Sequence, residues 1–547
     1  MKFPSKTVLM VSAVILLLVL GFVFIYNPFS QVNVSIERVE FLVKNDGWKI
    51  LRTIRVYLKN KGNDNVTINA VSVNGVSFSS WSSRWIIIYP GETKYIEIYY
   101  PWNGGEYTIS IDTSQGRVEV KKKSPTLTKI NVVFENYENK PLDEIASFEL
   151  FFADGEVKPG EVRVLDENGV EVLNQMWGIV TYQSGYVKTA VISFPLEVPP
   201  GGLKSFTIVF GEESSYSNSS TPSLKIERFE GYTVIYNGVI KVRFNETEYY
   251  HGNIDYFGSE EVNFAKMYRP ANSTRSGLSF FHGMIDAYFD DGNGKMYAYL
   301  MKTKMWIDSV GPLFAVYARR WNLKTEGYTY EFFAVPVNRP YMLYRAVVYV
   351  THEFTVGPNA GKPAPGEADY RYYNPSGMGN MAIPQLSVWR ALFFLTDTGD
   401  LYSPPYPGND LWIKHPVAAL RDYDEGVGIM LLGNDPANPL GYWHITLHKF
   451  PWYDWLGEVP SNDPAADLVF IAGIHERMLC YDGQDPNAEP YASERKVVPR
   501  GFVLLDEGTY SYLFAVRLIL NEDAVTVLRY MRSVFGGEGL KISVSGG

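Results

Sequence analysis

YTVIYNGVIKVRFNE, residues 232–246, decides how the largest part of this chain folds. Apolar and polar residues alternate on both sides of Asn237-Gly238, which is the period of a half-buried strand. Asn-Gly is a strong signal for a two-residue turn, because both residues accept a positive φ. The stretch therefore predicts an antiparallel β-hairpin.

The same alternation of apolar and polar residues continues downstream of this hairpin. Tyr, Phe, Val and Ile alternate with polar residues, which favours long antiparallel strands. These strands are expected at residues 294–308, 313–324, 327–337, 342–354, 389–397, 426–434, 441–450 and 540–545. Between them, residues 357–410 are rich in Pro, Gly and Tyr. Long loops of this kind inside a compact domain are commonly functional.

One soluble helix is expected, near the C-terminus. Asn521 is predicted to cap a helix over residues 522–535, and Gly536 is predicted to end it. Its apolar positions have helical spacing. They are Val525, Leu528, Met531 and Phe535.

Three segments, NGVIKVRF, GPLFAVYARRW and YEFFAVPVNRPYMLYRAVVYV, follow one another in this order. In strand order and texture they resemble the galactose-mutarotase-like β-supersandwich, a fold found in polysaccharide lyases and in many glycosidases. The resemblance implies one large antiparallel β domain over residues 224–547 that acts on or binds carbohydrate. It matches no catalytic residue of a named family to a position in this chain.

Upstream, a Ser-rich stretch at residues 212–223 is predicted to be a flexible linker. Before it, alternating segments at 129–136, 146–152, 189–198 and 204–210 predict a second β-sandwich over residues 126–211. No constellation of reactive side chains stands in this part, so a structural role is expected for it.

Residues 31–123 are predicted to form a first small β-sandwich, because short strands and turn signals recur at regular spacing. KNKGNDNVTINAVSVNG, YPGETKYIEIYY and GGEYTISIDTSQGRVEV resemble immunoglobulin-like modules of archaeal surface proteins, which usually act as spacers. Lys121–Pro125 is predicted to be the linker to the second sandwich.

The N-terminal run VLMVSAVILLLVLGFVFIY, residues 8–26, has no charge and no proline. As a helix with about 1.5 Å per residue it would reach about 30 Å, the thickness of a bilayer core. Lys2 and Lys6 precede it, and the next basic residue is Arg38. We therefore expect residues 1–30 to be a cytoplasmic tip and membrane anchor, with the bulk of the chain extracellular. A cleaved signal peptide is the alternative, but no small-x-small cleavage site follows the run.

The amino-acid composition limits the classes of partner that we expect for this chain. The net charge is −10, so a phosphate-backbone partner such as nucleic acid is not expected. Cys480 is the single cysteine, which rules out an intramolecular disulfide. Aromatic residues make up 15% of the chain, and we attribute most of them to sandwich packing. Glycosylation sequons begin at Asn33, Asn65, Asn218, Asn245 and Asn272, and they fit a glycoprotein.

Several motifs of known chemistry are absent from the sequence: there is no P-loop, no dinucleotide fingerprint, no His-Glu-x-x-His zinc motif and no Gly-x-Ser-x-Gly nucleophile motif. We therefore predict no cofactor and no metal. DAYFDDGNGKMY, residues 286–297, is rich in oxygen ligands, but its spacing does not match an EF-hand loop. A hairpin turn is the better interpretation.

The first candidate site is GYWHITLHKFPWYDWLGE, residues 441–458. On a strand His444 and His448 share one face, and Trp443 lies on the other. The two imidazoles would be about 13 Å apart, which is too far to chelate one ion but suits one groove. Flat aromatic faces suit the C–H faces of sugars. The predicted substrate-binding residues are Trp443, Trp452, Tyr453 and Trp455. The alternatives are a half-buried strand packed on the core, and a metal site.

The second candidate group stands in HERMLCYDGQDPNAEPY, residues 475–491. A polysaccharide lyase needs a base for the proton beside a uronate carboxyl and a cation that neutralises that carboxyl. His475, Arg477 and Tyr481 have the required side-chain types and join His444 and His448 as predicted catalytic residues. A glycosidase would need two facing carboxylates, and the sequence does not select the pair.

Two functions remain open on these grounds. The first is a membrane-anchored extracellular protein whose large domain binds polysaccharide. If this domain is an enzyme, it would cleave the polysaccharide as a lyase or a glycosidase. The second is a non-catalytic structural or adhesion protein of the cell envelope. Both predict the same architecture: a transmembrane helix, two small β-sandwiches, and one large antiparallel β-supersandwich with a C-terminal helix.

Overall fold

A computed structural model describes the chain from residue 33 onward with gaps. The described residues are 33–78, 81, 86–216, 224–247, 252–263, 288–290, 295–297, 304–323, 327–350, 354–356, 382–386, 393–399, 401–402, 410–412, 416–422, 424–432, 443–449, 468–474, 503–505 and 508–547. Within these ranges the chain is almost entirely strand, as the sequence predicts.

The first sandwich packs two sheets against each other. One consists of β3 (Val66–Val73), β4 (Val76–Phe78), β5 (Ile87–Ile88), β7 (Glu106–Thr113) and β8 (Gly116–Lys123). The other contains β1 (Val34–Asp46), β2 (Lys49–Asn60) and β6 (Thr93–Tyr99). The expected linker at residues 121–125 is partly wrong, because Lys121, Lys122 and Lys123 are the last residues of β8 and pair with β7.

The sheet of β1, β2 and β6 does not stop at the first sandwich. Lys49 at the start of β2 pairs in parallel with Glu149 of β10 (Leu142–Phe151), so the sheet runs on into the second sandwich. There it adds β13 (Val187–Val198) and β12 (Gln175–Thr181), in the order β1-β2-β10-β13-β12. The two sandwiches are therefore joined by strand pairing as well as by the chain.

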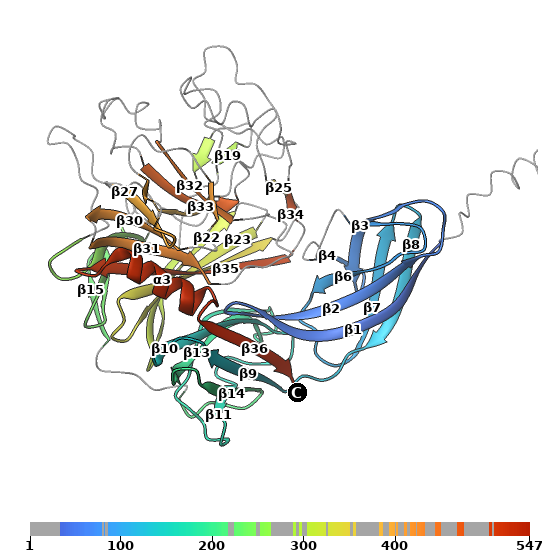
Figure 1. Cartoon of the computed structure of the whole chain (residues 1–547), viewed down its shortest axis with the longest axis horizontal. Coiled ribbons are helices and arrows are strands. Elements are labelled where there is room, and N and C mark those ends of the chain that lie inside the picture. The colour runs from blue at the N-terminus through green and yellow to red at the C-terminus, as the bar shows by residue number, and fades with distance from the viewer. Residues whose placement is uncertain are drawn as a thin grey trace, which may run out of the picture.

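The second sheet of the second sandwich has the order β11-β14-β9-β36. Its strands are β11 (Val162–Asp166), β14 (Leu203–Phe210), β9 (Lys129–Asn136) and β36 (Leu540–Gly546). The predicted final strand is confirmed, and it lies on β9 at the end of the chain (Figure 1). The chain thus returns from the large unit to complete the second sandwich.

The large unit is built on a nine-stranded antiparallel sheet in the order β21-β22-β23-β24-β35-β31-β30-β27-β28. Its strands are β21 (Lys304–Val310), β22 (Phe314–Leu323), β23 (Gly327–Pro336), β24 (Tyr341–Val350), β35 (Gly508–Leu520), β31 (Glu425–Leu431), β30 (Val417–Asp422), β27 (Phe393–Thr396) and β28 (Leu401–Tyr402). All neighbouring strands of this sheet pair in the antiparallel direction, which confirms the predicted antiparallel strands.

A four-stranded sheet covers part of this large sheet. It consists of β15 (Lys225–Phe229), β16 (Tyr232–Tyr236), β17 (Lys241–Asn245) and β18 (Asn253–Gly258). The predicted hairpin is confirmed: the Asn237 side chain accepts from the backbone N–H groups of Val239 and Ile240, and Gly238 has φ +92°. The Phe244 ring stacks on Tyr317 of β22 with centroids 3.9 Å apart, so the two sheets share a core.

Three small sheets complete the described strands. β26 (Ala382–Leu386), β33 (Leu468–Ile474), β32 (Trp443–Lys449) and β29 (Asp410–Trp412) form one sheet in this order. β25 (Phe354–Val356) pairs with β34 (Val503–Leu505). β19 (Tyr288–Asp290) pairs with β20 (Lys295–Tyr297), which confirms the predicted hairpin at residues 286–297.

The predicted C-terminal helix is present as α3 (Ala524–Phe535), but its predicted cap is wrong. The Asp523 carboxylate accepts from the backbone N–H of Thr526 at 2.8 Å and is the N-cap. Asn521 instead adopts φ +52° just after β35. Leu528, Met531 and Phe535 are buried as expected, whereas Val525 is only half-buried.

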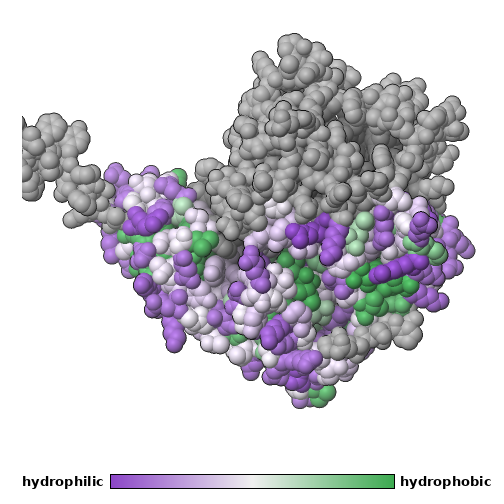
Figure 2. Space-filling view, turned by 180° about the vertical axis from the view of Figure 1, so that it is seen from behind, coloured by the Kyte–Doolittle hydropathy of each residue, from purple (hydrophilic) through white to green (hydrophobic). Residues whose placement is uncertain are grey.

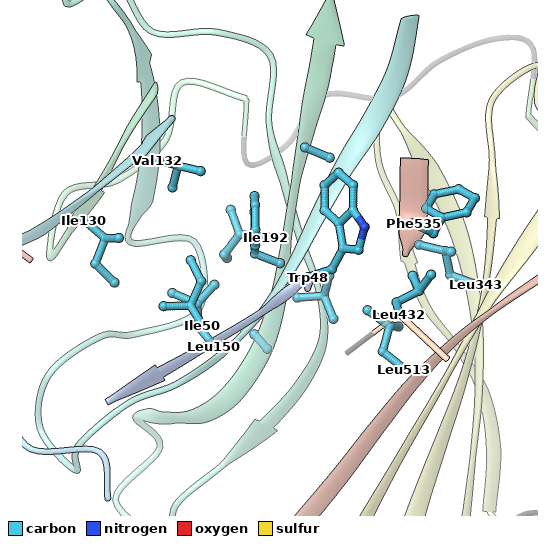
Figure 3. Close-up of a cluster of buried hydrophobic side chains, with 14 of the residues drawn as sticks. Trp48, Ile50, Ile130, Val132, Leu150, Ile192, Leu343, Leu432, Leu513 and Phe535 are labelled. Atoms are coloured by element: carbon cyan, nitrogen blue, oxygen red, sulfur yellow. The ribbon is translucent and has the colours of Figure 1, made fainter. Parts of the chain in front are cut away.

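Trp48 lies where the three units meet. It follows Gly47 in the tight turn between β1 and β2, and it is only 2% exposed. Figure 3 shows its ring between side chains of the second sandwich on one side and of the large unit on the other. Its ring centroid is 5.2 Å from that of Phe148 and 6.3 Å from that of Phe535. One indole therefore contributes to both cores.

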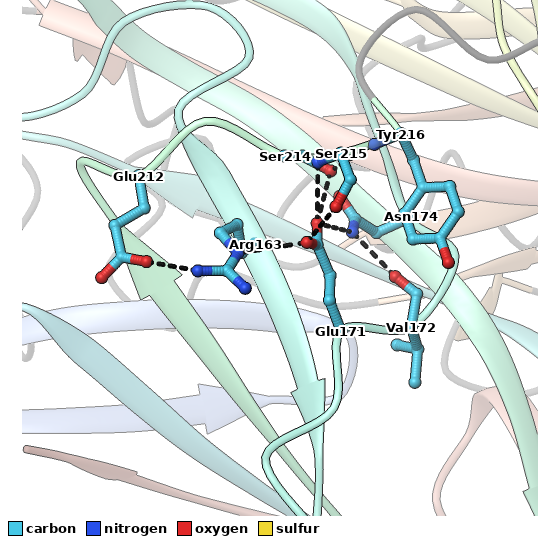
Figure 4. A network of polar contacts seen from close by, with 8 residues as sticks. All are labelled: Arg163, Glu171, Val172, Asn174, Glu212, Ser214, Ser215 and Tyr216. Carbon is cyan, nitrogen blue, oxygen red and sulfur yellow. Dashed lines mark hydrogen bonds and ion pairs between the residues drawn. The ribbon is translucent and has the colours of Figure 1, made fainter.

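The Ser-rich stretch after β14 begins with an anchored segment. The Glu171 carboxylate accepts from the hydroxyl groups of Ser214 and Ser215, and Arg163 joins Glu171 to Glu212 (Figure 4). Residues 217–223 of the predicted linker lie outside the described residues.

In the described part of the chain, no helix is long and apolar enough to cross a membrane. The predicted anchor at residues 8–26 lies outside that part. The anchor and the proposed boundaries of the domains therefore remain predictions.

Candidate functional site

Three of the predicted site residues lie on β32, the strand expected for GYWHITLHKF. Trp443 pairs with Ile474, His444 pairs with Gly473 and Trp412, and His448 pairs with Val469. β32 is thus an inner strand, flanked by β33 and β29. The strand prediction is confirmed, and the role of these three side chains remains a prediction.

The other six predicted residues lie outside the described residues. They are Trp452, Tyr453, Trp455, His475, Arg477 and Tyr481. β33 ends at Ile474, the partner of Trp443, and His475 follows it directly in the chain.

A different aromatic cluster stands on the described residues. Trp306 of β21, Tyr330 and Tyr328 of β23 and Tyr349 of β24 form a connected series, here called the aromatic strip. The centroid distances are 6.2 Å from Trp306 to Tyr330, 5.3 Å from Tyr330 to Tyr328 and 4.8 Å from Tyr328 to Tyr349. All four side chains are half-buried, so each keeps part of its surface in solvent.

Strand periodicity explains why the strip exists. In GYTYEFFAVP, alternate residues point to one face of the sheet, so Tyr328, Tyr330 and Phe332 share a face. Tyr349 is the register partner of Tyr328 and therefore joins the same face. Phe332 is fully buried, whereas the two tyrosines are not. Other parts of the molecule thus cover this face of the sheet at Phe332 and leave it partly open at Tyr328 and Tyr330, where the strip lies.

Part of that cover is the second sandwich. Gln175 of β12 accepts from the backbone N–H of Phe314 at 2.8 Å, and Arg345 donates to Glu149 at 2.8 Å. Lys188 of β13 also reaches the large unit, with its Nζ 4.1 Å from the Tyr349 ring centroid. The strip therefore lies beside the second sandwich, and both units border it.

Two more cations lie over the strip. The Arg320 guanidinium is 4.2 Å from the Tyr328 centroid and 5.6 Å from that of Tyr330. The Lys304 ammonium is 5.8 Å from the Trp306 ring. Such contacts are worth about 0.5–1 kcal/mol at exposed sites.

One carboxyl group borders the strip. Asp308 accepts from the Trp306 indole N–H at 3.3 Å and from the backbone N–H of Gly178 at 3.1 Å. Burial raises the pKa of Asp308, and these two hydrogen bonds and the Arg345 charge only partly oppose it. Burial likewise raises the pKa of Tyr328 to about 12, so this phenol stays neutral and can donate a hydrogen bond.

The opposite face of the same sheet carries a polar cluster that is closed to solvent. Glu331 accepts from Arg319 and, at 2.5 Å, from the Tyr344 hydroxyl, and all three residues are fully buried. Buried charges need such partners. This cluster belongs to the core under the four-stranded sheet, and it offers no surface to a ligand.

Sequence reasoning missed the aromatic strip. The sequence predicts strands for the segments that carry it, and most aromatic residues are expected to serve sandwich packing. Alternate tyrosines at 328 and 330 were the available signal, but Phe332 follows the same alternation and is buried. The pattern alone does not separate the exposed part of a strand from its covered part.

Seen from behind, the described surface of the molecule mixes hydrophilic residues with hydrophobic patches (Figure 2). Within the described residues, no group of three or more His, Cys, Asp or Glu side chains is placed to hold a metal ion. What the strip offers is ring faces, phenol hydroxyls and cations.

No family model and no curated protein matches this chain. Among solved structures, it is similar to an alpha-mannosidase from Enterococcus faecalis V583, with a TM-score of 0.33, 9% identity, and coverage of 76% of this chain and 46% of that chain. It is also similar to a glycosyl hydrolase family 38 protein from Enterococcus faecalis, with a TM-score of 0.32, 8% identity, and coverage of 76% and 47%. The chain spans about half the length of these proteins.

Proposed function

We propose that this chain is a membrane-anchored cell-surface protein whose large β domain, of the galactose-mutarotase-like supersandwich type, binds polysaccharide. The observation that carries the proposal is the aromatic strip of Trp306, Tyr328, Tyr330 and Tyr349. These residues form a connected, half-buried series on one face of a rigid sheet. Because the strip lies on strands, its rings are held in place before a ligand arrives.

The chemistry of the strip fits a sugar chain. A pyranose ring has an apolar C–H face and a rim of hydroxyl groups, and Tyr and Trp likewise combine an apolar face with a polar tip. The ring planes are at 90° between Trp306 and Tyr330, at 82° between Tyr330 and Tyr328 and at 32° between Tyr328 and Tyr349.

The location rests on the N-terminal sequence. The run at residues 8–26 is long enough to cross a bilayer, and Lys2 and Lys6 precede it. The N-terminus would stay in the cytoplasm, and the two sandwiches would hold the large unit outside the cell. The sequons fit this location.

Cleavage is a separate step within this proposal. It would need the predicted residues His444, His448, His475, Arg477 and Tyr481 to converge near the bound chain.

A non-catalytic envelope protein is the second candidate, and one observation favours it: strand pairs β2–β10 and β36–β9 join the units into a continuous framework. Such a framework suits a surface protein that bears load.

A glycan array with the full-length chain tests the proposal, followed by titration of the best ligand. Trp306→Ala and Tyr328→Ala should each weaken binding by roughly thirtyfold, which corresponds to the roughly 2 kcal/mol of an interface hot spot. Tyr95→Ala is the matched control, because Tyr95 is exposed, its ring contacts the Tyr57 ring, and it lies under Arg55. Absence of binding to any glycan, or equal affinity of all three variants, would contradict the proposal.

A further inference from the structure

Arg320 differs from the other arginines that lie over aromatic rings. In the described residues, each of those arginines also has a carboxylate within 4 Å. The pairs are Arg38–Glu40, Arg52–Glu156, Arg55–Glu97, Arg243–Asp255, Arg319–Glu331, Arg345–Glu149 and Arg517–Glu522. Arg320 has two ring contacts and, among the described residues, no carboxylate.

One hydrogen-bond donor of the Arg320 guanidinium has no partner. Its Nε is buried without a hydrogen-bond partner, while the side chain as a whole is only half-buried. Lys304, its register partner on β21, is exposed and likewise has no carboxylate partner among the described residues. The aromatic strip therefore carries two cations that have no carboxylate partner among the described residues, although the chain has 60 acidic and only 50 basic residues.

Asp308, the carboxyl group beside the strip, does not neutralise these cations. Its two oxygens accept from Trp306 and from the backbone of Gly178 rather than from Arg320 or Lys304. The positive charge of Arg345 also acts on Asp308, where it lowers the pKa against the larger effect of burial. Among the described residues, Arg320 and Lys304 therefore bring positive charge to the strip of an acidic protein.

We infer that the aromatic strip takes an acidic glycan, with the acid group of one sugar bound by Arg320. This inference rests on the proposed function and adds the class of ligand. A guanidinium binds carboxylate or sulfate through two parallel hydrogen bonds, and its stacking on a phenol ring fixes its plane. Charge complementarity thus selects acidic chains over neutral ones.

A matched pair of ligands tests the inference. Full-length protein would be titrated with a polyuronate and with the same polymer after its carboxyl groups have been reduced to alcohols. We expect the polyuronate to bind at least tenfold more tightly, and we expect this difference to shrink as salt is added. A sulfated galactan in a third arm shows whether sulfate replaces carboxylate.

Variants assign the effect to Arg320. Arg320→Gln should remove the preference for the acidic polymer while the reduced polymer binds as before, and Arg320→Lys should retain part of the preference. Arg38→Gln is the control, because Arg38 lies 4.0 Å over the Tyr57 ring in a comparable way. If Arg320→Gln fails to fold, the Arg320→Lys variant and the ligand pair on the unmodified protein still decide.

The outcomes separate the two proposals. Equal affinity for both polymers, or an unchanged preference in Arg320→Gln, overturns the inference and leaves glycan binding intact. No binding of either polymer, and none on the array, overturns the proposed function itself. A single-stranded oligonucleotide that binds through Arg320 and Tyr328 more tightly than the polyuronate also overturns the inference, because stacking and a cation would then serve a nucleic acid.

Discussion

The Nε atom of Arg345 donates to Oε1 of Glu149 at 2.8 Å, and both side chains are buried. Arg345 comes from β24 of the large unit, and Glu149 comes from β10 of the second sandwich. Lys49, from the first hairpin of the chain, lies 3.6 Å from the same carboxylate. Burial disfavours the Glu149 charge, but Arg345 and Lys49 outweigh burial and hold its pKa below the usual range. One carboxylate thus ties together all three units.

Arg345→Ala should destabilise the chain by about 3–5 kcal/mol, because it leaves Glu149 buried with reduced compensation. Urea unfolding followed by tryptophan fluorescence measures this loss. Arg117→Ala is the control, since the Arg117–Asp112 pair is exposed to solvent. Equal midpoints for the two variants would contradict a structural role for the buried pair.

Trp48→Ala should cost about 3–5 kcal/mol, as large-to-small changes of buried aromatics do. Because Trp48 contacts Phe148 and Phe535, the loss should also reduce the cooperativity between the sandwiches and the large unit. Calorimetry would then resolve two transitions. Phe229→Ala, at a position 59% exposed, should leave the melting profile unchanged. A single, unshifted transition in Trp48→Ala would show that this joint is not required.

Asp308 should make stability depend on pH. Burial raises its folded pKa above the ordinary 3.8, so the folded state binds this proton more tightly than the unfolded state. The resulting stabilisation is present below the ordinary pKa and is lost as pH rises through the raised value. Asp308→Asn cannot ionise, so its stability relative to the unmodified chain should improve as pH rises above the ordinary pKa of 3.8 and through the raised pKa of Asp308. A pH-independent difference in urea unfolding, or one of opposite sign, would refute this assignment.

Glu171→Ala should release Ser214 and Ser215 from the second sandwich, because their hydroxyl groups donate to the Glu171 carboxylate. Limited proteolysis should then cut residues 212–223 several times faster, since cleavage follows local opening. Glu167→Ala on the same hairpin is the control, because Glu167 pairs only with Lys204 at the surface. Identical cleavage rates would mean that Glu171 does not restrain this segment.

Local features of the fold were predictable from the sequence. Asn237-Gly238 fixes its hairpin through its own side chain and a positive φ, and the strand at residues 66–73 follows from simple alternation. The helix was found from its spacing, but its cap was misplaced by two residues. Asn521 and Asp523 both have cap-forming side chains, and only the geometry at Thr526 separates them.

Features that depend on distant parts of the chain were not predictable. Lys49 pairs with Glu149 a hundred residues away, and β36 crosses to the second sandwich, so neither pairing has a local signal. The aromatic strip was missed for the same reason, because the exposure of Tyr328 depends on where a separate unit stops covering the sheet. The predicted site at His444 and His475 remains a prediction.

Hydroxyl-radical footprinting of the full-length protein, with and without a saturating polyuronate, tests glycan binding by the aromatic strip most directly. It reports the solvent access of individual aromatic side chains by mass spectrometry. We predict protection of Trp306, Tyr328, Tyr330 and Tyr349, with no change at Tyr95. Protection confined to Trp443, Trp452 and Trp455, with the strip unchanged, would contradict the assignment and move the site to the segment around β32.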